Sequence, residues 1–293
     1  MQPYPIEGGA SLREQAERSL FKSHRKRLWT PFLHAIRDYQ LIRPNDRIAV
    51  CVSGGKDSTL LASLFAALER VTSVPFTVRY LCMDPGYLPE DRALLMNNAE
   101  ALGIPLHVFD TDVFDIVRSA GPGHCYLCAR MRRGHLYKEA QELGCNKIAL
   151  AHHYNDVVET ILMGMLYGAQ IQTMMPKLRS KNFPGMELIR PLYLVREPDV
   201  IAWRDRHGLT CLKCGCPMNM CAVDPNNRNA SKRGETKRLI AELKKTHPAV
   251  EQCIFQSVHR VNLNTIIGYV QDGTPRRFTD DYDAASAIEE PFD

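Results

Sequence analysis

The chain has 293 residues, of which 45% are apolar, and it carries a net charge of +4 at neutral pH. Its length suits one large domain with appendages, and no apolar run approaches the roughly 20 residues that a membrane helix needs. The N-terminus lacks the basic-then-apolar form of a secretory signal peptide. We therefore expect a cytoplasmic protein with no membrane partner, whose cysteines bind metal or react as thiols rather than form disulfides.

Strand and helix signals alternate from residue 46 onward, after a polar leader at 1–45 with loose helical periodicity. Apolar runs predict strands at 48–52, 76–83, 105–109, 147–151 and 188–189. Helices are predicted at 58–70, 89–102, 113–119, 126–143, 155–167 and 199–207. Strands that alternate with helices indicate an α/β fold, in which a parallel sheet is covered by helices on both faces.

The C-terminal part differs from this alternating core. We expect the core to span residues 46–222, followed by a basic helical region at 223–270 and an acidic tail without fixed structure at 271–293. A segment rich in proline, lysine and glycine at 174–185 reads as a loop. The leader and the basic region are then helical extensions of one core.

A glycine turn stands between the first predicted strand and the helix after it. It reads Ser53-Gly54-Gly55-Lys56-Asp57-Ser58. Adjacent glycines let a ligand approach the backbone closely, and the first turn of a helix offers unpaired N–H groups to an anion. The common P-loop would need glycine at Val50 and Ser or Thr at Asp57, so this is a different phosphate-binding pattern.

Polar side chains also follow the predicted strand at 147–151, namely His152, His153 and Asp156. Side chains at the carboxyl ends of neighbouring parallel strands can converge on one ligand. The string Ala151-His152-His153-Tyr154-Asn155-Asp156 resembles the Gly-His-His/Asn-x-x-Asp motif of thiolating PP-loop enzymes, with Ala151 in place of the glycine. This resemblance implies that Asp156, together with Asp57, holds Mg²⁺, which prefers carboxylate and phosphate oxygens. His153 is equally readily a structural residue.

Two Cys-x-x-Cys pairs occur, Cys125 with Cys128 and Cys211 with Cys214. Two intervening residues let both thiolates reach one metal, so two such pairs are a strong signal for a metal site. The spacing alone leaves zinc open. Cys216 and Cys221 follow closely and leave open which downstream thiol binds.

The glycine turn resembles the signature of PP-loop ATP pyrophosphatases, which bind ATP, adenylate a carbonyl oxygen and release pyrophosphate. Further segments resemble the tRNA 2-thiocytidine synthetase family, in the same order along the chain: 125–134, 147–153, 165–168, 176–178, 189–192 and 211–215. The chain departs from this family after Cys214, where the family continues Gly-Ser-Gln-Pro-Asn and this chain has Gly-Cys-Pro-Met-Asn.

This resemblance implies ATP, Mg²⁺ and a [4Fe–4S] cluster as cofactors. Carried over by position, Cys125, Cys128 and Cys211 hold the cluster, with Cys214 as the alternative third ligand. A cluster with only three thiolates leaves one iron open to deliver sulfur.

The resemblance also implies roles around the nucleotide. Lys56 would neutralise phosphate charge, and Arg132, on the same helix face as Cys128, would contact the adenylate or the RNA. The predicted catalytic residues are therefore Lys56, Arg132 and the two Mg²⁺ ligands, Asp57 and Asp156. The residues expected to bind ATP are Ser53, Gly54, Gly55, Lys56, Asp57, Ser58, Asp84 and His152. Asp84 is equally plausible as a loop cap.

The implied reaction is ATP-dependent thiolation of tRNA. The C2 oxygen of a cytidine attacks the α-phosphate of ATP, and sulfide or persulfide sulfur then displaces AMP. The reactive base would be splayed from an RNA loop. The resemblance also implies a sulfur donor system, such as a cysteine desulfurase, and a homodimer.

The uneven charge of the chain favours RNA as a partner. The last fifteen residues hold six acids and no base, so the remainder carries +10. Basic clusters stand at 22–27, 130–133 and 228–245. Most charge runs are solvated surface, but several clusters beside a nucleotide site are typical of RNA binding.

Two other functions remain open from the sequence. One is a PP-loop enzyme that has zinc in its cysteine cluster and modifies another nucleoside or uses a nitrogen donor. The other is a non-catalytic, metal-dependent RNA-binding protein, for which Asp57 and Asp156 would be unnecessary. Iron and sulfide analysis tests the first, and RNA-dependent pyrophosphate release tests the second.

Overall fold

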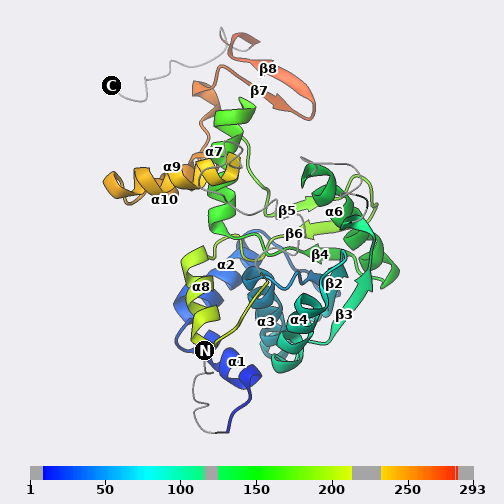
Figure 1. The fold of residues 1–293 in the computed structure, drawn as a ribbon. Coiled ribbons are helices and arrows are strands. Elements are labelled where there is room, and N and C mark those ends of the chain that lie inside the picture. The colour runs from blue at the N-terminus through cyan, green and yellow to red at the C-terminus, as the bar shows by residue number, and fades with distance from the viewer. Residues whose placement is uncertain (1–8, 115, 117–124, 213–231, 281, 283–293) are drawn as a thin grey trace.

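The computed structural model describes residues 9–114, 116, 125–212, 232–280 and 282, with only the backbone described at 125–129. Six strands form one sheet in the order β3-β2-β1-β4-β6-β5. They are β1 (Arg47–Cys51), β2 (Thr77–Asp84), β3 (Leu106–Asp110), β4 (Lys147–Ala149), β5 (Lys177–Arg179) and β6 (Glu187–Ile189). All neighbouring pairs run parallel except β5 and β6 (Figure 1).

Helices connect the parallel strands, as the sequence predicted. They are α3 (Lys56–Val71), α4 (Pro89–Ala101), α6 (Cys125–Glu142) and α7 (Tyr154–Gly168), and α8 (Glu197–Arg206) follows the last strand of the sheet. The leader forms α1 (Leu12–Phe21), a π-helical turn (Arg25–Trp29) and α2 (Thr30–Asp38). The C-terminal part forms α9 (Lys232–Thr246), α10 (Val250–Ser257), a hairpin of β7 (Gly268–Gln271) and β8 (Thr274–Arg277), and 3-10 turns at Leu263–Thr265 and Phe278–Asp280.

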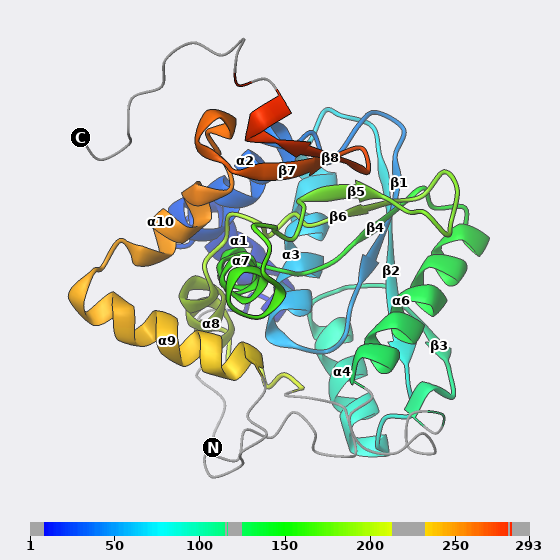
Figure 2. The ribbon, with the colours of Figure 1, turned by 90° about the horizontal axis from the view of Figure 1, so that it is seen from above.

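The two faces of the sheet bury separate apolar clusters. The larger cluster joins one face to the leader helices, α3 and α7–α10, and includes Phe32, Phe65 and Trp203. The smaller cluster joins the other face to α6, through Tyr137 and Ala140. Figures 1 and 2 show α6 alone on its side of the central strands, opposite α3. The predicted α/β architecture with both faces covered is confirmed.

The strand order reverses beside β1. The chain runs from β1 outward through β2 to β3, and then crosses by α6 to β4 on the other side of β1. The loops that leave β1 and β4 therefore diverge, and such a switch point opens a crevice at the carboxyl ends of the strands. The glycine turn and the segment 150–156 lie at this point.

The structure corrects two expectations. Residues 174–185 contain the edge strand β5, which pairs antiparallel with β6, so the sheet is not wholly parallel. A strand of three residues, two of them exposed, gives no alternating pattern to detect. The tail expected to lack fixed structure from 271 instead contains β8. Asp272 and Gly273 form the hairpin turn with positive φ, and Asp-Gly is the usual signal for such a turn.

Some predictions lie outside the described residues. These include most of the predicted helix at 113–119, Cys214, the side chains of Cys125 and Cys128, and residues 283–293 of the tail. Within the part of the chain that is described, no helix has the length and apolar character needed to cross a membrane.

Candidate active site at the ends of strands β1 and β4

The glycine turn is a rigid loop closed by its own hydroxyls. The Ser53 N–H donates to Ser58 Oγ (3.1 Å), and Ser58 Oγ donates to the Gly55 carbonyl (3.0 Å). Gly54 has φ +76°, a left-handed conformation that favours glycine. A Cβ at Gly54 would lie 2.7 Å from Leu212 Cδ1, so the Leu212 side chain would have to shift to admit any other residue.

Helix α3 starts at the end of this turn with free donors. Gly55 is its N-cap, and no side chain among the described residues caps the first turn. The leading N–H groups and the positive end of the helix dipole are therefore available to an anion. The turn thus has the properties that the sequence predicted for a phosphate cradle.

A pocket of about 380 Å³ opens beside the turn, between the strand ends and α6. It is lined by Cys51, Val52, Ser53, Gly55, Asp57, Ser58, Met83, Arg132, Arg133, Leu136, Leu150, Ala151, His152 and Asp156. The walls are mostly apolar on the strand side and basic on the α6 side. Such a pocket suits a flat base with an attached anionic group. The predicted residues Ser53, Asp57, Arg132, His152 and Asp156 thus share one cavity.

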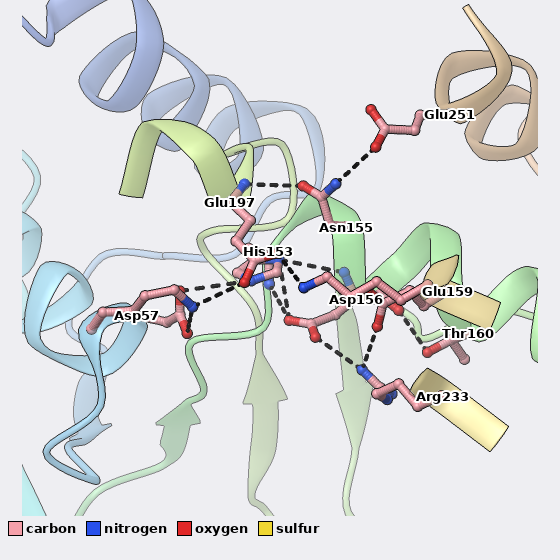
Figure 3. Close-up of polar contacts among 11 residues, drawn as sticks. Asp57, His153, Asn155, Asp156, Glu159, Thr160, Glu197, Arg233 and Glu251 are labelled. Atoms are coloured by element: carbon pink, nitrogen blue, oxygen red, sulfur yellow. Dashed lines mark hydrogen bonds and ion pairs between the residues drawn. The ribbon is translucent and has the colours of Figure 1, made fainter. Parts of the chain in front are cut away.

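Asp57 and Asp156 stand on either side of His153 (Figure 3). His153 Nε2 lies 3.6 Å from Asp57 Oδ1, and His153 Nδ1 lies 3.3 Å from Asp156 Oδ2. His153 and Asp156 also form a capping box at the start of α7, in which the His153 N–H donates to Asp156 Oδ2 (2.9 Å). The buried His153 therefore fixes Asp156 through its backbone N–H, while its ring lies next to Asp57 at a distance longer than a hydrogen bond.

Lys56 is held between two carboxylates. Its Nζ lies 2.9 Å from Asp57 Oδ2 and 3.2 Å from Glu197 Oε1. Burial lowers the pKa of Lys56, but Asp57 and Glu197 outweigh it and the net shift is upward. Lys237 of α9 pairs with the other oxygen of Glu197 at 2.7 Å. Burial alone would raise the pKa of Glu197, but Lys237 and Lys56 lower it to about 2.

Arg233 of α9 contacts two other carboxylates, Asp156 and Glu159 of α7. Its Nη1 donates to Asp156 Oδ1 (2.9 Å) and to Glu159 Oε2 (3.2 Å) (Figure 3). Sequence reasoning did not single out Arg233, Glu197 or Lys237. The only sequence signal for the two bases was the charge run at 228–245, because the contacts arise when α9 folds back onto α7 and α8.

His152 and Arg190 form a buried electropositive corner of the site. Burial, followed by the charge of Arg190, lowers the pKa of His152 to about 4, so its ring is neutral at pH 7. His152 Nδ1 and Arg190 Nε have no hydrogen-bond partner within the described structure. Burial, followed by the charge of Arg133, lowers the pKa of Arg190 to about 10. Unpaired buried polar atoms are costly, so these two are positions where water or a bound molecule would supply a partner.

Asp84 lies outside the pocket lining. Its Oδ1 accepts from the N–H groups of Gly86 (2.9 Å) and Tyr87 (2.7 Å), and its Oδ2 accepts from Arg92 Nη1 (2.9 Å). These contacts close the loop after β2, which favours the loop-capping interpretation of Asp84.

The segment that carries Cys211 lies against the glycine turn. The Leu212 N–H donates to the Gly54 carbonyl (2.9 Å), and Asn98 Nδ2 donates to the Thr210 carbonyl (2.7 Å). Cys211 is a half-buried free thiol. Burial raises its pKa. Cys211, the first cysteine of the second Cys-x-x-Cys pair, thus lies next to the residue that contacts the glycine turn.

The glycine turn at a topological switch point defines the class of protein. The chain belongs to the PP-loop domain family, whose model matches residues 24–213. The structure of the U34-tRNA thiolase NcsA from Methanococcus maripaludis, described with its [4Fe–4S] cluster, has the same fold. Its TM-score is 0.60 and its identity 21%, and the match covers 89% of this chain and 81% of that chain.

Curated relatives give a more particular likeness. The chain is 37% identical to a tRNA-cytidine(32) 2-sulfurtransferase of Anaeromyxobacter dehalogenans (strain 2CP-C) over 230 residues, which are 78% of this chain and 76% of the relative. It is 33% identical to the protein of the same name from Vibrio vulnificus (strain YJ016), over 85% of this chain and 78% of that relative. The predicted resemblance to the thiocytidine-forming enzymes is thus confirmed.

Proposed function

We propose that the protein is an ATP-dependent tRNA sulfurtransferase that converts a cytidine to 2-thiocytidine. One observation carries this proposal. The glycine turn, the carboxylates Asp57 and Asp156, and the basic residues of α6 line a single pocket, beside the helix that begins at Cys125. The names of the curated relatives, and their identity over most of this chain, support tRNA cytidine as the substrate.

ATP fits this site with its phosphates on the glycine turn. The N–H groups at the start of α3 and the Lys56 ammonium bind the phosphate oxygens, and both stabilise the charge that develops on pyrophosphate as it leaves. The C2 oxygen of cytidine attacks the α-phosphorus, and the bond from the α-phosphorus to pyrophosphate breaks. Sulfide sulfur then bonds to C2, and AMP departs with the former C2 oxygen, leaving a thiocarbonyl.

Mg²⁺ fits the pair of carboxylates beside the turn. Asp57 and Asp156 both line the pocket, on either side of His153, and hard carboxylate oxygens are the ligands that Mg²⁺ prefers. When bound, the metal neutralises charge on the phosphates. The two aspartates would hold it, while Lys56 binds the phosphates from the other side of Asp57.

A [4Fe–4S] cluster fits the cysteines in donor type, since thiolates are the ligands of such clusters. Cys211 is a free thiol whose neighbour Leu212 rests on the glycine turn, and α6, which begins at Cys125, supplies Arg132 to the pocket wall. We assign Cys125 and Cys128 as ligands, together with Cys211 or Cys214. When bound, the cluster supplies an open iron that holds the sulfur to be transferred.

Further parts of the proposal concern partners. Arg132 and Arg133 line the pocket and would contact the adenylate or the RNA backbone. A cysteine desulfurase system would supply the sulfur. The cytoplasm as location and a homodimer as assembly complete the proposal.

The test is an anaerobic assay with unmodified tRNA, ATP, Mg²⁺ and sulfide, in which nucleosides are analysed by mass spectrometry. We expect 2-thiocytidine and one pyrophosphate per thiolated base, with both lost in Cys125→Ala and retained in Cys253→Ala, an exposed cysteine of α10. About four irons and four labile sulfides per chain should accompany activity. Zinc without labile sulfide would contradict the cluster, and no RNA-dependent pyrophosphate release would contradict the enzyme.

A further inference from the structure

We propose that Arg233 is a phosphate-binding residue of the ATP site, which exchanges Asp156 for the β- and γ-phosphates when ATP binds. The inference rests on the proposed function only for the identity of the nucleotide. It adds a functional residue from α9, a helix that follows the stretch matched by the PP-loop model.

The position of Arg233 is the first argument. Asp156 lines the pocket, and Arg233 Nη1 lies 2.9 Å from its Oδ1, so the guanidinium stands at the rim of that pocket. Its side chain is 43% exposed, which leaves donors free to turn toward a ligand. Guanidinium groups bind phosphate oxygens with two parallel N–H donors, and this geometry makes arginine the preferred residue for such contacts.

The two carboxylates that Arg233 contacts differ in how far their stabilisation depends on Arg233. Asp156 Oδ2 already accepts the His153 N–H at the start of α7, so Asp156 has a second role that does not depend on Arg233. Glu159 is buried, and burial raises its pKa while the charge of Arg233 opposes that shift. Glu159 can therefore keep Arg233 in place while its contact with Asp156 exchanges for phosphate.

The charge balance of the site supports a further cation. The described carboxylates at the turn and its surroundings are Asp57, Asp156, Glu159 and Glu197, and they are paired with Lys56, Lys237 and Arg233. Among the described residues, the unpaired positive charge of the pocket lies on the opposite wall, at Arg132 and Arg133. A triphosphate adds several more negative charges to this environment. Catalysts of phosphoryl and adenylyl chemistry meet that charge with fixed cations, and an arginine from a separate element is a common source.

Helix α9 is anchored so that Arg233 stays within reach. Lys237, one helical turn further on the same face, pairs with Glu197 at 2.7 Å. Lys232 lies over the ring of Tyr167, 5.1 Å from its centroid. Ile240 is buried in the main apolar cluster. These contacts fix the helix while leaving the Arg233 side chain free to change partners.

The experiment compares two nucleotides. Calorimetry with Mg²⁺ measures the affinity for α,β-methylene-ATP, which carries all three phosphorus groups but cannot be cleaved between α and β, and for AMP. In Arg233→Ala we expect the methylene-ATP affinity to fall by about 10- to 100-fold, the range of a charge-assisted hydrogen bond, and the AMP affinity to change less than about twofold. Arg238→Ala is the matched control, because Arg238 is an exposed arginine of the same helix.

A purely structural role for Arg233 predicts a different pattern. Arg233→Ala would then lower the melting temperature, and it would either reduce the affinities for the two nucleotides by the same factor or leave both affinities unchanged. Either result would overturn the inference. Arg233→Lys should recover part of the preference for methylene-ATP over AMP, since a point charge replaces the two-donor contact. If the wild type binds no methylene-ATP, the proposed function itself is contradicted. If the wild type binds methylene-ATP and Arg233→Ala does not change that affinity, only the inference about Arg233 is contradicted.

Discussion

Helices α9 and α10 attach the C-terminal part to the same helix, α7, by different kinds of contact. Phe255 of α10 stacks on Tyr154 with a centroid distance of 4.5 Å, and the buried Glu251 accepts hydrogen bonds from Asn155, Arg196 and Lys244. Helix α9 instead directs Arg233 and Lys237 onto carboxylates of the pocket region. Figure 2 shows α9 and α10 diverging from a common turn, with α7 and α8 between them.

This difference indicates which contacts can change when a ligand binds. The stacked rings and the fully paired buried carboxylate of α10 have no alternative partners of similar free energy, so α10 is a structural anchor. Half-exposed ion pairs can exchange partners at small cost, because water and ligands compete for them. Four predictions test this contrast.

The largest effect is expected where the anchor is removed. Phe255→Ala should lower the free energy of unfolding by about 3–5 kcal/mol, because the ring is buried between Tyr154 and Tyr193 and leaves a cavity. Urea unfolding measures this. At urea concentrations where the variant is still folded, its affinity for methylene-ATP should stay within about twofold of wild type, a change of about 0.4 kcal/mol in binding free energy. A tenfold loss in the folded variant would place α10 in the active site.

Glu197→Gln should reduce stability by about 1–3 kcal/mol at neutral pH, because it removes the charge that Lys56 and Lys237 share. The pKa of Glu197 falls from 4.5 to about 2 on folding, so its contribution is present above pH 4.5 and lost as pH decreases toward 2. The difference between wild type and variant should shrink over that interval. Glu242→Gln, which breaks an exposed pair with Lys245, should cost less than about 1 kcal/mol.

Gly54→Ala should weaken nucleotide binding by about tenfold, since the positive φ costs about 1–2 kcal/mol for a residue with a Cβ. The added carbon also meets Leu212 at 2.7 Å, so Leu212→Ala in the same chain should restore only part of the affinity. Gly168→Ala, where a Cβ meets nothing within 4 Å, serves as the control. Equal losses of nucleotide affinity in Gly54→Ala and Gly168→Ala would show that the turn does not require glycine at position 54.

The smallest effect concerns His152. Its pKa drops from 6.5 to about 4 on folding, so the unfolded chain binds the proton first and stability falls as pH decreases from 6.5 toward 4. Between pH 6.5 and 5.5 this histidine should account for about 1 kcal/mol of lost stability, which His152→Gln removes. His207 has a similarly lowered pKa outside the pocket, and His207→Gln should flatten the same profile without changing nucleotide affinity. An unchanged profile in His152→Gln would show that the ring is not buried in its neutral form.

The sequence predicted the part of the site that depends on strand order. Asp57 and Asp156 each follow a strand closely, and the ends of parallel strands meet at one edge of the sheet, so their proximity follows from the fold class. The glycine turn was predicted for the same reason. Glu197, Arg233 and Lys237 could not be predicted, because they meet only after α8 and α9 pack against α7. Nothing in their local sequence encodes that meeting.

The elements that the sequence analysis missed, β5 and the β7–β8 hairpin, share a local cause. Strand β5 is three residues long and exposed at the sheet edge, so neither burial nor alternation marks it. The β7–β8 hairpin did have a signal, the Asp272-Gly273 turn, but its strands carry exposed residues throughout and no apolar face. Apolar periodicity identifies elements that bury a face, and these elements bury none.

The contact of Leu212 with Gly54 couples the strand-end turn to the residue that follows Cys211. The Leu212 N–H donates to the Gly54 carbonyl, and the Leu212 side chain packs directly over Gly54. A displacement of the backbone at Cys211 is therefore transmitted to the glycine turn through one residue, without passing through the sheet.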